Sequence, residues 1–277
     1  MSSKHKLRQL IKNENLNFDN LKTMLVAAHP DDEVVGIGSL LRYLKNIQIV
    51  HVTDGSPRDM FDAIKSGCTS RQAYAKKRRV EMISALSLAG HKSADCISLE
   101  FIDQEASLNL PGVSLRIVEL IERLKPQLVL AHAYEGGHPD HDATAFGVWA
   151  ACRMLKRENK QTPDIIEFAS YHGNGSNQII TNRFIPVENT EVVEIRLSNM
   201  EQNLKKQMIE CFRTQRDVLS EFTVKYEQLR NAPSYNFSLL PHEGTLYYDY
   251  YQWGMSSSRW LRLANEAMRV LRLGENL

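Results

Sequence analysis

The sequence predicts an α/β protein: a doubly wound, mostly parallel sheet with a C-terminal extension of helix and strand. Apolar-rich runs at 24–27, 47–52 and 128–131 have the length and composition of buried parallel strands. Each run ends in a polar turn, and a stretch with helical periodicity follows. Strand and helix therefore alternate along the chain, which is typical of a parallel sheet covered by helices on both faces.

The individual elements follow from periodicity and from residues that start or stop helices. Gly90 ends one expected helix, Pro111 begins the next and Pro126 stops it. The loop at 56–70 is long, and loops of that length are often functional. In chain order we expect strands at 23–28, 47–52, 96–101, 127–133 and 165–171, and helices at 33–45, 71–89, 111–124 and 142–156.

The last third of the chain has a different character. A strand is expected at 190–195, a long amphipathic helix from Ser198 to about Glu221, and a final helix at 257–271. No repeat or low-complexity linker interrupts the chain. We therefore expect one domain with three parts: an N-terminal arm or helix at 1–21, a main domain at 22–222, and an extension at 223–277 that packs on the main domain.

The composition argues against several classes of partner. The 277 residues include 34 basic and 33 acidic side chains, so no nucleic acid or anionic membrane is expected to bind by charge. No run has transmembrane length, and the polar N-terminus lacks a secretory pattern, which favours a cytoplasmic protein without membrane insertion. The four cysteines lack zinc-finger or redox-pair spacing and are expected to be reduced. The oligomeric state stays open, a homo-oligomer included.

The most informative segment is the first motif, Ala28-His29-Pro30-Asp31-Asp32-Glu33, which follows an apolar strand and opens a helix. Open α/β sheets place their chemistry at the carboxyl ends of strands, where this motif is expected to lie. A second motif, Gly137-His138-Pro139-Asp140-His141, follows another apolar run in the same way. Two such clusters at one sheet edge predict a single metal site built from both.

The residue types in the two motifs suit a catalytic zinc. Such a site has three protein ligands and one open position, and His29 and Asp32 with either His138 or His141 can supply the three. Zinc lowers the pKa of bound water and polarises a carbonyl. Asp31 is placed to take a proton from that water, and the remaining histidine to stabilise an oxyanion or protonate the leaving group.

A simpler interpretation exists for each motif taken alone. Aspartate is a preferred N-cap residue, so Asp31 or Asp32, and likewise Asp140 or Asp142, can serve only to start a helix. An isolated His-x-x-His pair is more often structural than metal-binding. The metal hypothesis rests on the conjunction, because both motifs carry His-Pro-Asp, both follow apolar strands and both open helices.

The two motifs together resemble those of the LmbE/PIG-L family of zinc-dependent de-N-acetylases, which have a Rossmann-like fold. The resemblance covers roughly 22–222 and includes Thr53-Asp54-Gly55 and Arg78-Arg79-Val80-Glu81. A C-terminal helix with Lys205 and the segment 211–215 is also similar, although Phe212 and Thr214 replace the usual Tyr and Ser. The two histidine motifs are specific, and the other matches are supporting.

The resemblance implies a role for each motif residue. It implies Zn²⁺ ligands at His29, Asp32 and His141, one ion per chain, with another divalent transition metal as the alternative. It implies Asp31 as the general base and His138 as the group that stabilises the intermediate, with Asp140 behind it.

Further residues are weaker candidates for substrate binding. The resemblance suggests that Arg78 reaches the substrate, although a surface pair with Glu81 would explain it equally well. Arg58 lies in the long loop and could grip a sugar or an acid. Asp103 and Gln104 follow the third strand at the same sheet edge.

The predicted function is a metal-dependent amidohydrolase that removes an acetyl or similar acyl group from an N-acylated amine. An amino sugar conjugate or a small metabolite is the expected substrate. Two alternatives remain: another metal-dependent hydrolase, such as a phosphoesterase, or a non-catalytic Rossmann-like binding protein. The first turn lacks a Gly-x-Gly-x-x-Gly fingerprint, and its three carboxylates would repel a pyrophosphate, which counts against a nucleotide.

Overall fold

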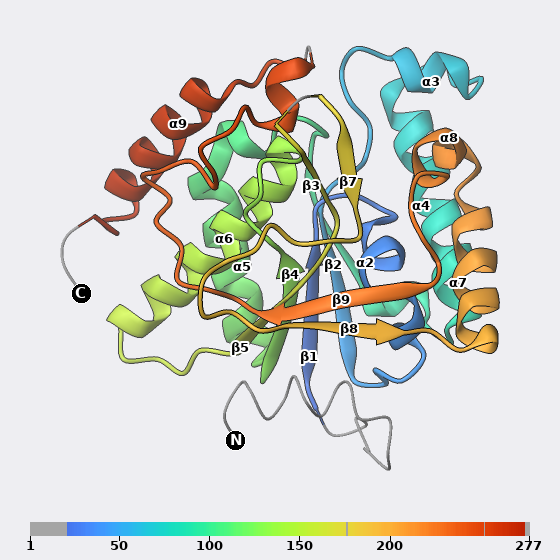
Figure 1. The fold of residues 1–277 in the computed structure, drawn as a ribbon, viewed down its shortest axis with the longest axis horizontal. Coiled ribbons are helices and arrows are strands. Elements are labelled where there is room, and N and C mark those ends of the chain that lie inside the picture. Colours follow the sequence, from blue (N-terminus) through green and yellow to red (C-terminus); the bar gives the residue numbers. More distant parts are fainter. Residues whose placement is uncertain (1–20, 176, 252, 275–277) are drawn as a thin grey trace.

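The computed structural model describes residues 21–175, 177–251 and 253–274. Within these ranges seven strands form one sheet in the order β3-β2-β1-β4-β5-β9-β8, and β6 pairs with β7 separately. Neighbouring strands are parallel from β3 to β5, whereas β9 and β8 join in antiparallel fashion. The expected doubly wound, mostly parallel α/β fold is confirmed (Figure 1).

The strands are β1 (Thr23–Ala27), β2 (Ile47–Thr53), β3 (Cys96–Phe101), β4 (Leu128–His132), β5 (Asp164–Phe168), β6 (Tyr171–Gly173), β7 (Ile179–Thr181), β8 (Val192–Arg196) and β9 (Tyr226–Asn231). The α-helices are α2 (Asp32–Leu41), α3 (Phe61–Lys65), α4 (Arg71–Leu88), α5 (Leu110–Leu124), α6 (Pro139–Arg157), α7 (Asn199–Cys211), α8 (Arg216–Leu219) and α9 (Ser257–Val270).

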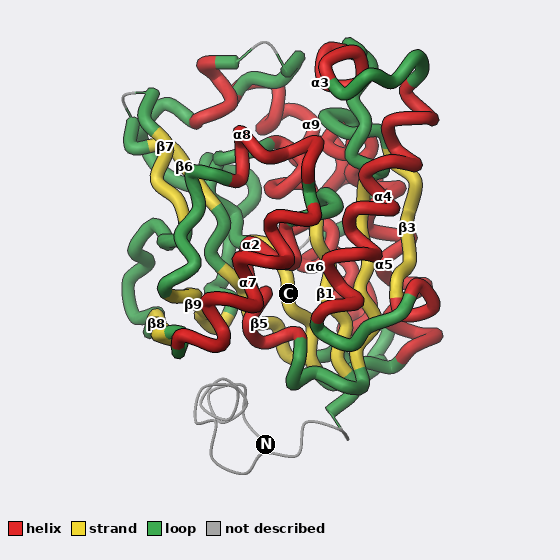
Figure 2. The backbone as a smooth tube through the Cα atoms, turned by 90° about the vertical axis from the view of Figure 1, so that its right-hand side faces the viewer, coloured by secondary structure: helices red, strands yellow, loops and turns green. Residues whose placement is uncertain are grey.

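Helices cover both faces of the sheet. Figure 1 shows α5, α6 and α9 on one side and α2, α4 and α7 on the other, and the second group faces the viewer in Figure 2. Successive residues of β1 point to opposite faces, so Met24 and Val26 join one apolar core cluster and Leu25 and Ala27 join the other. Trp260 of α9 lies in the same cluster as Met24, so the end of the described chain packs on the main sheet.

The sheet order brings the two motifs together. β1 pairs with β4 in parallel, from Thr23 opposite Leu128 to Val26 opposite Ala131, although these strands are about a hundred residues apart. Their carboxyl ends therefore meet at one edge, beside the end of β2. This is the point at which the strand order reverses, where α/β sheets bind their ligands.

Several expected element boundaries were wrong. α6 begins at Pro139 rather than at Asp142, because His138 is its N-cap and proline suits the first helical position. α2 ends at Leu41, short of the expected 45. The expected strand at 165–171 is divided between β5 and β6, because Ser170 accepts a hydrogen bond from Asn182 N–H and the chain turns toward β7.

The long helix expected from Ser198 to Glu221 ends at Cys211. Phe212 leaves the helical conformation and is buried, and Thr214 donates from its N–H and its hydroxyl to Glu81 on α4. These tertiary contacts break the amphipathic pattern into α7, a 3₁₀ turn and α8. The loop expected at 56–70 likewise contains a short helix, α3.

One strand of the main sheet, β9, was missed. Its sequence, Tyr-Glu-Gln-Leu-Arg-Asn, has the charge of a surface segment, yet Glu227 and Arg230 are buried. Both are paired: Lys205 binds Glu227 at 2.9 Å, and Arg230 binds Glu167 at 2.7 Å. The N-terminal arm expected at 1–21 lies, except for its last residue, outside the described residues. Among the described helices, none combines the length and apolarity that a bilayer crossing would need.

Candidate active site

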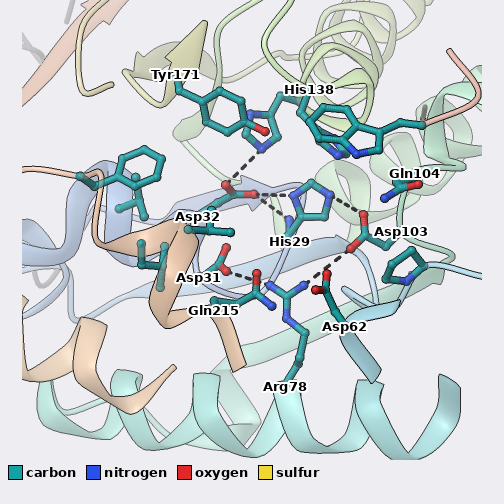
Figure 3. Close-up of a pocket in the computed structure, with 17 residues that line it drawn as sticks. His29, Asp31, Asp32, Asp62, Arg78, Asp103, Gln104, His138, Tyr171 and Gln215 are labelled. Atoms are coloured by element: carbon teal, nitrogen blue, oxygen red, sulfur yellow. Dashed lines mark hydrogen bonds and ion pairs between the residues drawn. The ribbon is translucent and has the colours of Figure 1, made fainter. Parts of the chain in front are cut away.

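A pocket of about 160 Å³ opens at the carboxyl edge of the parallel strands (Figure 3). The loop after β1 contributes His29, Asp31 and Asp32, and the start of α6 contributes His138 and His141. The rest of the lining comes from the loop after β2, the helices α2, α3 and α4, the loop after β3, β6, and the C-terminal third: Pro57, Val35, Asp62, Arg78, Asp103, Gln104, Tyr171, Gln215, Val218, Leu219, Phe222 and Trp253. The structure therefore gathers both motifs around one cavity.

Two of the residues expected to hold a metal, His29 and His141, both contact the third, Asp32. His29 Nδ1 is 3.2 Å from one oxygen of Asp32, and His141 Nε2 is 3.1 Å from the other. Two atoms bound to one tetrahedral zinc lie about 3.4 Å apart, because each bond is about 2.0–2.2 Å long. Burial lowers the pKa of His141 to about 3, so its imidazole is in the neutral form that metals bind.

His132 supports this group from behind. Its ring stacks on His141 at 4.0 Å, and its Nε2 lies 3.2 Å from Asp32. It is the last residue of β4, and Ala28 N–H donates to the same nitrogen. The position of His132 at the end of a strand could have indicated a place in the site, but no spacing pattern links this residue to either motif.

Two carboxylates face the other nitrogen of His29. Asp103 lies 3.0 Å and Asp140 3.3 Å from Nε2. Burial alone would lower the pKa of His29, but Asp103, Asp140 and Asp32 outweigh it and hold that pKa well above its usual value. The surroundings of His29 thus favour a positive charge at this point.

Asp140 is fixed mainly by backbone groups. Its oxygens accept from the N–H groups of Gln104 at 2.6 Å and Ala106 at 3.0 Å. The carboxylate therefore ties the loop after β3 to the start of α6 and reaches His29 rather than the ring of His138.

His138 differs from its expected charged form. Burial lowers its pKa to about 3, with His29 adding to the effect, so the ring is neutral. The backbone N–H of Asp140 donates to Nδ1, which leaves the hydrogen on Nε2. The ring sits edge-on to His29 at 4.6 Å and against Trp253 at 4.7 Å. His138 can therefore donate one hydrogen bond into the pocket without being protonated.

Asp31 has a strained backbone and one cationic neighbour. Its φ of 133° lies in a region that residues with a Cβ rarely adopt. Arg78 Nη2 donates to its carboxylate at 2.8 Å. Burial raises the pKa of Asp31 to about 8 even though Arg78 opposes the shift. A carboxylate with a raised pKa is a stronger base than an exposed aspartate.

The two arginines expected to bind substrate lie in different places. Arg78 lines the pocket and is buried, but it already donates to Gly55 O, Pro30 O and Asp31. Arg58 is outside the pocket lining and forms an exposed pair with Glu105. The neighbour of Arg58, Pro57, does line the pocket.

The pocket rim comes largely from the C-terminal third, whose contribution sequence patterns did not reveal. Trp253 stacks on Tyr251 at 4.6 Å and covers His138. Gln215 donates to the hydroxyl of Tyr74, and Tyr171 lies against His141 at 5.1 Å. Aromatic and amide groups at this rim can pack on sugar faces and bind hydroxyl groups.

The donor set fits a divalent metal ion. Among the described residues, three overlapping groups of buried donors each lie within 4.8 Å: His29, His138 and His141; Asp32, His132 and His141; and His29, Asp103, His138 and Asp140. The buried acids of this pocket outnumber its one buried arginine, and buried charges need a partner. A bound cation would supply the missing positive charge.

A family model described as GlcNAc-PI de-N-acetylase, PIG-L, matches residues 24–152. The chain is therefore similar to the PIG-L family over this stretch, which is just under half of its length. The matched part holds both motifs, Arg78 and Asp103, whereas the rim residues Tyr171, Gln215 and Trp253 lie beyond it. The expected resemblance is confirmed over the matched residues, and the protein is a hydrolase of the de-N-acetylase class.

Individual relatives agree with this placement. The chain is 29% identical over 157 residues to the probable N-acetyl-alpha-D-glucosaminyl L-malate deacetylase 2 of Bacillus anthracis, an alignment that covers 54% of the chain and 67% of that protein. It is 28% identical over 141 residues to the 1D-myo-inositol 2-acetamido-2-deoxy-alpha-D-glucopyranoside deacetylase of Corynebacterium diphtheriae, covering 43% of the chain and 48% of that protein.

The fold of this protein is also found in solved structures. The A40926 pseudoaglycone deacetylase Dbv21 superposes with a TM-score of 0.57 at 18% identity, covering 77% of this chain and 97% of the other. At that identity the likeness concerns the fold alone.

Proposed function

We propose that this protein is a zinc-dependent hydrolase that removes an acetyl group from an N-acylated amine, with an amino sugar conjugate as the substrate. The observation that carries the proposal is the convergence of His29, Asp32 and His141 in one pocket with Asp31 beside them. Two neutral histidines, a third histidine and buried carboxylates suit zinc among divalent ions.

His29, Asp32 and His141 would hold the ion. When bound, zinc supplies a Lewis acid that polarises the amide carbonyl and makes water more acidic. His132 keeps Asp32 and His141 in place through its 3.2 Å contact and its stacked ring. Partners of this kind orient ligands and are costly to remove.

Asp31 is the proposed general base. Its raised pKa suits proton abstraction from the attacking water, and the same carboxyl can then return the proton to the leaving nitrogen. Arg78 holds the carboxylate at 2.8 Å and, through Gly55 O and Pro30 O, fixes the loops on both sides. We assign Arg78 to positioning Asp31 as well as to the substrate wall.

His138 is the proposed donor to the oxyanion. The neutral ring carries its hydrogen on Nε2, and Trp253 on one side restricts its movement. A preorganised donor of this kind typically lowers the barrier by about 3–4 kcal/mol. Asp140 contributes by fixing the loop that carries Gln104 and by contacting His29.

The amino sugar is favoured by the pocket walls. Gln104, Gln215 and Asp103 offer polar groups for hydroxyls, and Trp253 and Phe222 offer apolar faces. Both curated relatives carry N-acetylglucosamine-type substrates in their names. Arg58 remains a candidate contact for the part of the substrate that extends past Pro57.

The test is acetate release from a panel of N-acetylglucosamine glycosides and small N-acetylated amines, measured with and without a chelator. We expect release from at least one glycoside, loss on chelation and recovery with Zn²⁺. A metal-replete protein that leaves every amide intact contradicts the proposal. Cleavage of a chromogenic phosphate ester by the same sample would instead identify a phosphoesterase.

A further inference from the structure

The start of α2 has an unusual arrangement of acids. Asp31 is the N-cap residue, and an aspartate there normally accepts a hydrogen bond from the first turn. Asp31 makes no such bond, and its carboxylate turns to Arg78 instead. Glu33 contacts the N-cap residue itself, because its Oε2 accepts from Asp31 N–H at 3.0 Å.

Glu33 is in turn held by His51 of β2. His51 Nε2 lies 2.9 Å from the same Oε2, and a carboxylate oxygen accepts, so the imidazole donates. Both side chains are almost completely buried, Glu33 at 0% and His51 at 2% exposure. Neither residue lines the active-site pocket.

The strained backbone of Asp31 connects these contacts to the reaction. A φ of 133° costs free energy for a residue with a Cβ, and such strain persists only where surrounding contacts hold it. The Glu33 carboxylate is the group that receives the Asp31 N–H in this conformation. The same conformation points the Asp31 side chain at Arg78 and into the pocket.

We propose that His51 and Glu33 are positioning residues that hold the strained backbone of Asp31 and so aim the catalytic carboxylate. The inference deepens the proposed function and rests on Asp31 being the base. A purely structural role for the pair predicts a loss of stability, whereas a positioning role predicts a loss of turnover in a folded protein.

The sharpest variant replaces the whole pair, His51→Leu with Glu33→Met. Replacing both partners of a buried hydrogen-bonded pair by apolar residues of similar volume is often tolerated, so the fold is expected to survive. We expect kcat to fall about 100-fold, as for a misplaced catalytic group, with KM and zinc content nearly unchanged. Full retention of kcat would overturn the proposal.

The chain offers a matched control in Lys205→Met with Glu227→Leu. This pair is equally buried, and Glu227 accepts from Ser39 N–H of the same helix at 2.9 Å. Both double replacements therefore remove a buried pair and leave one N–H of the α2 region without its carboxylate. The control is expected to keep its kcat. An equal loss of kcat in both variants would mean that any damage near α2 has this effect, and would also overturn the proposal.

Chemical rescue gives a second readout that a structural role would not move. A cavity of about 270 Å³, distinct from the active-site pocket, is lined by His51, Pro30 and Thr53. In His51→Ala, added imidazole should enter this cavity and raise kcat at least severalfold, whereas the single variant His51→Gln, which retains a donor, should need no imidazole. If imidazole has no effect and Gln is as slow as Ala, donation from residue 51 is not what matters.

A crystal structure of the His51→Leu, Glu33→Met variant separates this inference from the proposed function. We expect Asp31 to relax to negative φ and to lose its contact with Arg78. Retention of both contradicts the positioning role even if no deacetylase substrate is found. Absence of acetate release from the wild-type protein contradicts the proposed function but leaves this structural test in force.

Discussion

Two buried clusters of charged side chains, one around Arg230 of β9 and one in the active-site pocket, are built differently. In the C-terminal part, Arg230 bonds Glu167 at 2.7 Å, lies 3.3 Å from Glu135 and also bonds the Tyr235 hydroxyl. In the pocket, three carboxylates, those of Asp31, Asp32 and Asp103, lie near a single arginine. The imidazoles of His138 and His141 beside them are neutral.

The difference separates structural charge from functional charge. Arg230 supplies the cation that the carboxylates of its own cluster need, so that cluster holds β5 to β9 without a ligand. The pocket instead concentrates acid with too few protein cations, and this arrangement is stable when a metal ion and a substrate complete it. Substitutions in the two clusters should therefore fail in different ways.

The largest effect is expected from removing a metal ligand. His141→Ala should lose bound zinc and all measurable acetate release, because one of the three proposed ligands is gone. Elemental analysis of the purified variant checks this. A variant with a full complement of zinc would remove His141 from the ligand set.

The next effect is expected at the proposed base. Asp31→Asn keeps a similar shape but cannot accept a proton, so turnover should fall about 10²–10⁴-fold while zinc stays bound. Steady-state acetate release with parallel metal analysis measures both quantities. Asp62→Asn, another acid of the pocket wall, is the comparison, and it should lose far less. A native rate in Asp31→Asn would refute the assignment.

In the structural cluster the expected loss is in stability. Arg230→Met leaves Glu167 and Glu135 buried without their cation and should lower the free energy of unfolding by about 3–5 kcal/mol. Urea unfolding measures this, and adding Glu167→Gln should recover part of the loss. An unchanged unfolding midpoint would show that this cluster is not held together by its charges.

The same cluster should make stability depend on pH. Burial raises the pKa of Glu167 to about 7 and that of Glu135 to about 8, above their usual 4.5. Between the usual pKa of 4.5 and these raised values, the native state holds protons that the unfolded chain has released. The free energy of unfolding therefore falls as pH rises through this window. The penalty of Arg230→Met should accordingly be smaller at pH 5 than at pH 8, and the opposite order would contradict the explanation.

The smallest effect is expected at Arg58. Its side chain is exposed and pairs with Glu105 outside the pocket, so Arg58→Ala should change KM for a glycoside by no more than a few-fold. Initial-rate kinetics on glycosides of increasing length give the test. A rise in KM that grows with substrate length would instead establish Arg58 as a distal contact.

The sequence predicted those elements whose local hydrophobic pattern matches their burial in the folded protein. The apolar runs of β1 and β4 and the polar residues after them predicted both the sheet and the meeting of His29 with His141. The hidden parts depend on partners far along the chain. β9 has the sequence of a surface segment, yet it is buried, because Lys205 and Glu167 neutralise its charged side chains.

The same distinction applies within the site. Asp103 was a weak candidate and His132 was not a candidate, because nothing near either residue in the sequence indicates a role. Their significance comes from the distances of 3.0 Å to His29 and 3.2 Å to Asp32. The rim residue Trp253 is more than a hundred positions from His138, and no periodicity connects them.

The adjacency of β1 and β4 has a consequence for how the protein matures. A nascent chain that has emerged only as far as β3 carries His29 and Asp32 but not the imidazole from α6 that completes the set. The ion therefore cannot be captured tightly until the ribosome has delivered roughly the first half of the polypeptide and the fourth strand has inserted beside the first. Binding of the proposed metal ion would therefore indicate that β4 has paired with β1.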